Sequence, residues 1–163
     1  MSQEHHVRYY SFVDRPFGDV RSLLRERARE VFERATSSAA ARARTLGASL
    51  HAQAAGLDLA VAVHIHVHRV VDEEGVAGLP PLTKLSVSWE ATENAWLFPI
   101  MNAEVRIWPL TSTETQIEIA GRYRPPFGPT GAALDTVALH RIAEATVHRF
   151  LEDVVEQLRR EPR

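Results

Sequence analysis

Apolar and polar residues alternate in several segments of this chain, and this alternation constrains its fold more than any other feature. Residues 83–91 read TKLSVSWEA, and residues 102–108 and 115–123, NAEVRIW and TQIEIAGRY, alternate in the same way. Because successive side chains of a strand point to opposite faces, each segment predicts a strand with one apolar and one polar face. Strands of this kind are typical of an antiparallel sheet that is covered on one side and solvated on the other.

The stretch VAVHIHVHRV at residues 61–70 shows the same alternation, with histidines in the polar phase. We interpret residues 49–70 as a hairpin that turns near Ala55 and Gly56, because the apolar phase then agrees on its two arms. This register predicts that four histidines share the polar face, namely His51, His64, His66 and His68.

The histidines at positions 64, 66 and 68 do not predict a metal site. Residues two apart on a strand are separated by about 6.6 Å and residues four apart by about 13 Å, so one ion does not readily bind all three. A structural zinc site needs four ligands and a catalytic one three. We expect instead a row of partly solvated imidazoles, one of them beside Glu90, that titrates near neutrality.

Two further segments predict helices. In residues 20–35, which follow a short predicted strand at 7–13, apolar residues recur every three or four positions. Residues 36–47 are small and fit either a longer helix or a connection. A long helix with one apolar stripe is predicted at residues 132–160. The order of strand, helix, five or six antiparallel strands and long helix indicates an α+β domain with its helices on one face of the sheet.

Composition excludes some classes of function. The chain has 163 residues, which fits a single domain, residues 1–163. Its net charge of −2 argues against nucleic-acid binding, which needs a basic surface. It has no cysteine, which removes disulfides, thiolate metal sites and cysteine nucleophiles. The polar N-terminus and the lack of a long apolar run predict a cytoplasmic protein that does not insert into membranes.

The segments LFPIMNAEVRIWPL, TQIEIAGRYRPPFGPTGAALD and LHRIAEATVHRFL, all within residues 97–151, resemble the START-like superfamily, also called SRPBCC. The likeness covers nearly the whole chain in element order, and the chain resembles bacterial members that mostly carry no assigned activity. The resemblance implies a helix-grip fold, in which a curved antiparallel sheet wraps around the long C-terminal helix and a shorter helical segment follows the first strand. It also implies an apolar cavity between the sheet and that helix, and it transfers no catalytic residue.

The residues expected to line this cavity share the apolar phase of the strands or the stripe of the C-terminal helix. They are Val87, Trp89, Val105, Ile107, Ile119, Gly121, Tyr123, Ile142, Thr146, Val147 and Phe150. All are also ordinary core material, so a solid core is the competing interpretation. Gly121 and Tyr123 stand out, because a strand glycine leaves space beside it and a tyrosine adds a polar tip to an apolar pocket.

Few titratable groups are predicted to face the cavity. The apolar phase of the strands contains no Asp, Glu, His or Lys. Tyr9 and Tyr10 are adjacent, so only one of them faces inward, and the sequence does not decide which. His140, Glu144 and His148 follow one another at helical spacing, and we interpret them as a solvated helix face.

The sequence leaves three functions open. The first is a protein that binds a hydrophobic small molecule, a lipid or a polyketide-like compound, without catalysis, cofactor or metal. The second is a cyclase or aromatase-like enzyme that relies on pocket shape, with Tyr123 or His140 assisting proton transfer. The third is a structural homodimer that pairs through a sheet edge or through the arginine-rich first helix.

Overall fold

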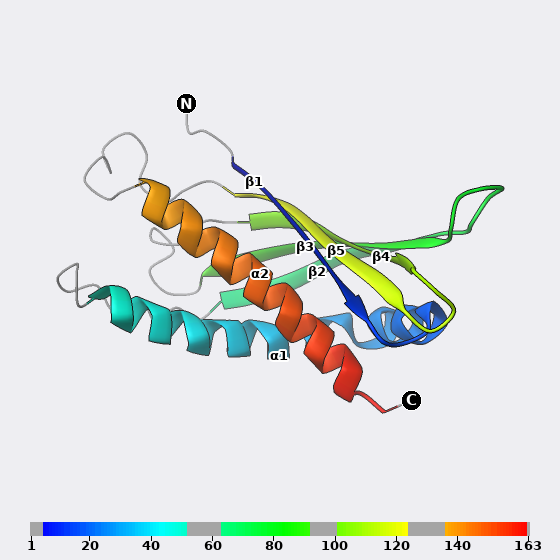
Figure 1. The fold of residues 1–163 in the computed structure, drawn as a ribbon, viewed down its shortest axis with the longest axis horizontal. Helices are drawn as coiled ribbons and strands as arrows, with labels where there is room; N and C mark the ends of the chain where they lie inside the picture. The colour runs from blue at the N-terminus through cyan, green and yellow to red at the C-terminus, as the bar shows by residue number, and fades with distance from the viewer. Residues whose placement is uncertain (1–4, 52–62, 92–100, 124–135, 163) are drawn as a thin grey trace.

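The computed structural model describes residues 5–51, 63–91, 101–123 and 136–162, which hold five strands and two helices. The strands form one sheet in the order β1-β5-β4-β3-β2, and every neighbouring pair is antiparallel. Both helices pack on the same face of this sheet, which we call the inner face (Figure 1). The predicted α+β, helix-grip architecture is therefore confirmed. The elements are β1 (His5–Val13), α1 (Phe17–His51), β2 (Val63–Glu73), β3 (Leu82–Ala91), β4 (Met101–Pro109), β5 (Thr115–Tyr123) and α2 (Thr136–Arg160).

Helix α1 is the longer of the two helices, although a shorter segment was predicted there. It runs for 35 residues and α2 for 25. Ser49, Leu50 and His51 belong to α1, so the predicted hairpin strand is wrong for these three residues, and His51 does not share the strand face of the other histidines. The predicted turn at residues 55–56 lies outside the described residues. The stretch 36–51 is rich in alanine, which favours a helix without needing an apolar stripe.

Helix α1 bends at Arg27, whose backbone leaves the helical region with φ −134° and ψ 22°. The bend divides α1 into a short first segment and a long second segment that runs in another direction (Figure 1). Leu24 before the bend and Phe32 after it are both fully buried, so both segments contribute to the core. In the described part of the chain, no helix is long and apolar enough to cross a membrane.

Strand β2 contains a bulge at His68, where the register with β3 shifts between Val67 and Arg69. One extra residue reverses the alternation of side chains, so Asp72 pairs with the buried Thr83 on the inner face. The prediction that the inner face carries no acidic residue is therefore wrong. Strand β2 continues past the bulge to residue 73.

Asp72 is held by three groups around it. The Thr83 hydroxyl donates a hydrogen bond to its carboxylate at 2.7 Å, and Arg21 and Arg25 of α1 pair with it at 3.1 and 3.3 Å. Burial acts to raise the pKa of Asp72, but the hydrogen bond from Thr83 and the two arginine charges together outweigh it. The pKa of Asp72 therefore lies below its usual value.

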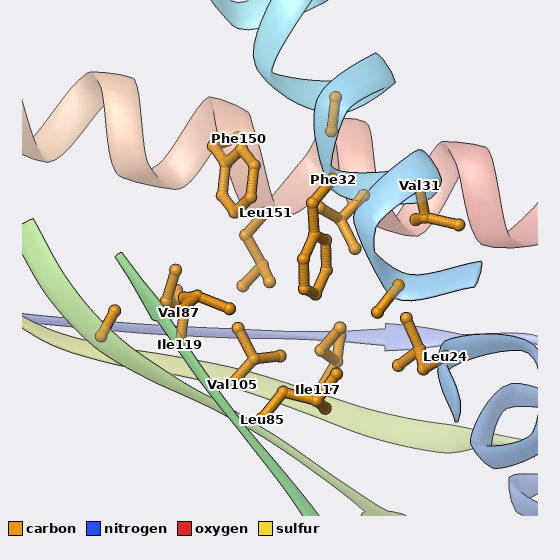
Figure 2. Packing of buried hydrophobic residues seen from close by; sticks show 14 of the residues in the cluster. Leu24, Val31, Phe32, Leu85, Val87, Val105, Ile117, Ile119, Phe150 and Leu151 are labelled. Atoms are coloured by element: carbon orange, nitrogen blue, oxygen red, sulfur yellow. The ribbon is translucent and has the colours of Figure 1, made fainter. Parts of the chain in front are cut away.

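The core fills the space between the inner face and the two helices. Figure 2 shows Phe150 of α2 and Phe32 of α1 pointing toward the strands, where Val105 and Ile119 point back at them. Burying one such side chain stabilises the fold by about 1.5–3 kcal/mol. The phase predicted from the alternation in β3, β4 and β5 is confirmed by these positions.

A buried arginine holds the C-terminal end of α2. Arg15 lies between β1 and α1, and its side chain and backbone together are only 6% exposed. One terminal nitrogen of its guanidinium donates to the carbonyl oxygens of Leu158 at 2.7 Å and of Glu161 at 2.8 Å. Carbonyls at a helix C-terminus carry partial negative charge, which offsets the cost of burying the guanidinium.

The Glu161 side chain ties the same end of α2 to the bend of α1. Its carboxylate accepts hydrogen bonds from Arg27 at 2.5 Å and from Arg34 at 2.8 Å. Glu30 bonds to the same two arginines, so the four side chains form one network. Because the Glu161 side chain is buried, this network is less screened by solvent than an ordinary surface pair.

Replacing Arg15 tests the importance of this contact. The substitution Arg15→Met keeps an apolar stem but leaves the last carbonyls of α2 without their buried donor, so the free energy of unfolding should fall by about 2–4 kcal/mol. Urea unfolding followed by circular dichroism measures this loss. Arg159→Met is the matched control, because Arg159 is exposed and its ion pair with Asp14 is long, at 3.6 Å. Equal losses in the two variants would contradict the role of Arg15.

The ion pairs of Asp72 predict a pH dependence of stability. Because its folded-state pKa is lowered, Asp72 contributes stability that is present above its unfolded pKa of about 4 and is lost as the pH falls through the folded value. Asp72→Asn should therefore be less stable than the wild type at pH 7, and the gap should narrow below about pH 4. Urea unfolding at a series of pH values measures the gap, with the exposed Asp14→Asn as control. A gap that widened in acid would refute this assignment.

Candidate functional site

The inner face of the sheet has two ends that differ in their side chains. At the first, which we call the Met101 end, Trp89 of β3 pairs with Met101 of β4. At the second, which we call the Thr115 end, Val13 of β1 pairs with Thr115 of β5. The C-terminal half of α2 runs toward the second end, since Arg15 binds its last carbonyls there.

The Thr115 end is filled by side chains. Residues from both helices and three strands meet there with no exposed surface, namely Val13, Leu24, Ile107, Ile117 and Leu158. Protein interiors of this kind are close-packed, so these side chains occupy the space between the sheet and the helices at this end.

The Met101 end carries a series of aromatic rings. The Trp89 ring lies 5.4 Å from the Phe150 ring of α2, and Phe150 lies 6.0 Å from Phe32 of α1. Such tilted pairs add about 0.5–1.5 kcal/mol beyond the area they bury. Phe32 and Phe150 are buried, but Trp89 is only partly buried. The Met101 end is therefore an apolar wall in which the Trp89 ring is partly accessible.

Gly121 lies in this wall for a reason that differs from the one predicted. A Cβ atom at Gly121 would lie 3.0 Å from the Cβ of Ala103 and 3.2 Å from the sulfur of Met101. The space beside this glycine is therefore occupied by neighbouring strand residues. Glycine is needed because the strands approach closely here.

Tyr9 is the tyrosine that faces inward. It pairs with Ile119 on β5 and is partly buried against the core, whereas Tyr10 is 73% exposed. The Tyr9 ring meets the His148 ring of α2 edge-on at 5.4 Å. Burial raises the pKa of the Tyr9 hydroxyl, and the charge of Glu144 raises it further, so Tyr9 keeps its proton at neutral pH.

The structure places most of the predicted cavity residues on the inner face or the facing side of α2. Val87, Val105, Ile107, Ile119, Gly121, Val147 and Phe150 are buried, and Trp89 is partly buried. Ile107 belongs to the filled Thr115 end, away from Trp89. The side chains of Tyr123, Ile142, Thr146 and His140 lie outside the described residues.

Sequence reasoning missed Met101 as a site residue. Met101 is 2% exposed, and its backbone pairs with Trp89 and with Tyr123 in the middle of the Met101 end. The sequence pattern could have indicated it. Met101 lies two residues before Ala103 and so extends the alternation of apolar residues in β4 toward the N-terminus.

The histidine row lies on the face of the sheet opposite the helices. His64, His66 and His68 are all exposed, as predicted, and the backbone of His64 pairs with that of Glu90. The His66 and His68 rings stack at 6.3 Å, and His68 Nε2 lies 2.6 Å from the Ser88 hydroxyl. Among the described residues, no group of three or more His, Asp or Glu side chains is placed to hold a metal ion.

Comparison with known proteins finds similar solved structures at low sequence identity. No protein-family model matches the sequence, and no curated protein matches it. The Zhui aromatase/cyclase from Streptomyces sp. R1128 is 12% identical, with a TM-score of 0.46 over 96% of this chain and 92% of its own. A protein from Thermus thermophilus is 9% identical, with a TM-score of 0.48 over 94% of this chain and 97% of its own. Norcoclaurine synthase from Thalictrum flavum is 11% identical, with a TM-score of 0.37 over 93% of this chain and 88% of its own.

These similarities concern the arrangement of helices and strands. The structure has the arrangement that the START-like resemblance implied, a five-stranded antiparallel sheet with a C-terminal helix across one face. The activities named for the similar structures belong to those proteins.

The close contacts of Gly121 predict a sharp effect of a single methyl group. Gly121→Ala places a Cβ against Ala103 and should lower the free energy of unfolding by about 1–3 kcal/mol. Ala103→Gly in the same chain removes the nearest atom and should restore part of that loss. Gly18→Ala is the control, because a Cβ at Gly18 meets nothing within 4 Å. Thermal unfolding of the four proteins checks this, and a neutral Gly121→Ala would contradict the close approach.

Proposed function

We propose that this protein binds a hydrophobic small molecule, a lipid or a polyketide-like compound, between the inner face of the sheet and α2. The observation that supports the proposal is the difference between the two ends of the sheet. The Thr115 end is filled by fully buried side chains, whereas the Met101 end presents the partly buried Trp89 beside an apolar wall. Burial of apolar ligand surface against such a wall supplies the binding free energy.

We propose binding without catalysis. Acid–base catalysis needs a titratable group positioned on the reacting atoms. Within the described residues of the inner face, Tyr9 is the titratable group nearest the aromatic wall, and burial and the charge of Glu144 move its pKa away from neutrality. Asp72, an acidic residue of that face, lies near the other end and is held by two arginines.

We further propose that residues 1–163 form one START-like domain that works in the cytoplasm. The described helices and strands all contribute to a single core cluster, which supports one domain. A chain without cysteine suits a reducing compartment, which supports the location.

Ligand binding can be tested with two matched tryptophan variants. Native mass spectrometry of the protein purified from its own host should show bound small molecules. Oleate should also displace 1-anilinonaphthalene-8-sulfonate from the purified protein. Trp89→Ala should weaken oleate binding about tenfold, which corresponds to about 1.4 kcal/mol. Trp108→Ala should leave the affinity unchanged, because Trp108 pairs with Gln116 in the polar phase of its strand.

Two results would refute the proposal. The first is an absence of both bound molecules and oleate uptake. The second is an equal loss of affinity in Trp89→Ala and Trp108→Ala, since that would place the ligand outside the inner face. Circular dichroism of both variants separates a loss of affinity from a loss of fold.

A further inference from the structure

Two residues with little or no side chain lie next to each other on the inner face, one step along the strands from Met101. Ala103 of β4 pairs with Gly121 of β5. Their neighbours across the sheet are both valines, Val87 on β3 and Val7 on β1. Because a small side chain stands less far above the sheet than a valine does, this pair forms a shallow depression that faces α2. We call the depression at Ala103 and Gly121 the hollow.

Larger residues close the hollow toward the Thr115 end. The next inward-facing pair on the same two strands is Val105 and Ile119, which are 1% and 0% exposed. Ala103 is 9% exposed, although β4 is the middle strand of the sheet. An inward-facing residue of a middle strand is reached by solvent through the space between the sheet and the helices. These exposures therefore indicate that this space extends to Ala103 and ends before Val105.

On the helix side, the same boundary lies at Phe150. Val147 and Phe150 of α2 are 4% and 5% exposed, whereas Leu151 is 1% exposed. The Phe150 ring points from α2 toward the sheet (Figure 2) and lies 6.0 Å from the ring of Phe32, which is fully buried. Because the core behind Phe150 is close-packed, its ring has no space into which it can recede.

The backing of Phe150 is fixed by the contacts at the end of α2. Phe32 lies on α1 between Arg27 and Arg34, and both arginines bind the buried carboxylate of Glu161. This part of α1 is therefore attached to α2 itself, and the two rings keep their relative position. A boundary of this kind limits how deep a bound molecule can reach.

We propose that the hollow holds the inner end of an unbranched acyl chain, and that Phe150 and Val105 set how far the chain enters. This inference rests on the proposed function and narrows its ligand to a molecule with an acyl chain. The accessible surface at this depth is small, which suits the narrow end of a hydrocarbon chain better than the broad face of a fused-ring compound. Trp89 then contacts the chain nearer to the Met101 end.

Fatty acids of increasing length test this limit. Displacement of 1-anilinonaphthalene-8-sulfonate by saturated acids from octanoate to stearate measures the affinity of the wild type for each chain. Affinity should rise about fourfold with each added methylene, which corresponds to about 0.8 kcal/mol, and should level off where the chain reaches the boundary.

Two substitutions should move the levelling point in opposite directions. Ala103→Leu fills the hollow and should shift the levelling point to chains shorter by about three methylenes, the size of the added side chain. Phe150→Leu removes part of the boundary and should shift it to longer chains. Ala103→Val is a milder filling variant, which should shift the levelling point in the same direction as Ala103→Leu if that variant does not fold.

Ala120→Leu is the matched control, because Ala120 is the neighbour of Gly121 on the opposite face of β5 and is partly exposed. It should leave the levelling point where it is, and circular dichroism checks the fold of every variant. The inference is overturned if affinity rises through stearate without levelling off, if the filling and Phe150 variants leave the levelling point unmoved, or if Ala120→Leu moves it equally. In those cases the proposed function stands, whereas a wild type that binds no fatty acid refutes both.

Discussion

The rest of the structure depends on how the end of α2 is fixed. Arg15 is one of few charged residues buried in the described part of the chain, and its guanidinium donates hydrogen bonds to the last carbonyls of α2. The side chain of Glu161 is bound by Arg27 at the bend of α1 and by Arg34 further along the same helix. Together these contacts join the β1–α1 corner, the bend of α1 and the end of α2 into one unit. The position of α2 over the sheet follows from that unit.

Fixing α2 in this way explains why the two ends of the sheet differ. Near Arg15 the helices and strands meet without gaps, and the residues there are fully buried. Toward the Met101 end the contacts between α2 and the sheet are made by rings, with Phe150 between Trp89 and Phe32. Rings pack over a range of tilts, whereas a buried guanidinium needs its acceptors at fixed positions. The position of α2 is therefore more tightly fixed at the Thr115 end, where Arg15 holds it, than at the Met101 end.

The sequence predicted the strands well because one face of the sheet is covered. Apolar residues alternate with polar ones in β3, β4 and β5, and only one orientation of each strand buries all the apolar residues. Val87, Val105 and Ile119 were therefore placed correctly. The same reasoning failed in residues 49–51, because a segment this short fits the end of a helix as well as an alternating strand. It also failed after His68, where a bulge reverses which side chains face inward. No residue type at that position indicates a bulge.

The polar part of the structure was beyond sequence reasoning for a different reason. Arg15 binds carbonyls more than 140 positions away along the chain, and no spacing rule connects such residues. Which of Tyr9 and Tyr10 faces inward also depends on a contact with a residue distant in the chain. Two adjacent tyrosines fit either alternation of inward and outward side chains along the strand. Only the pairing of Tyr9 with Ile119 shows which of them faces inward. Local patterns predict which face of an element is buried, while the pairing of distant elements decides which polar group is buried with it.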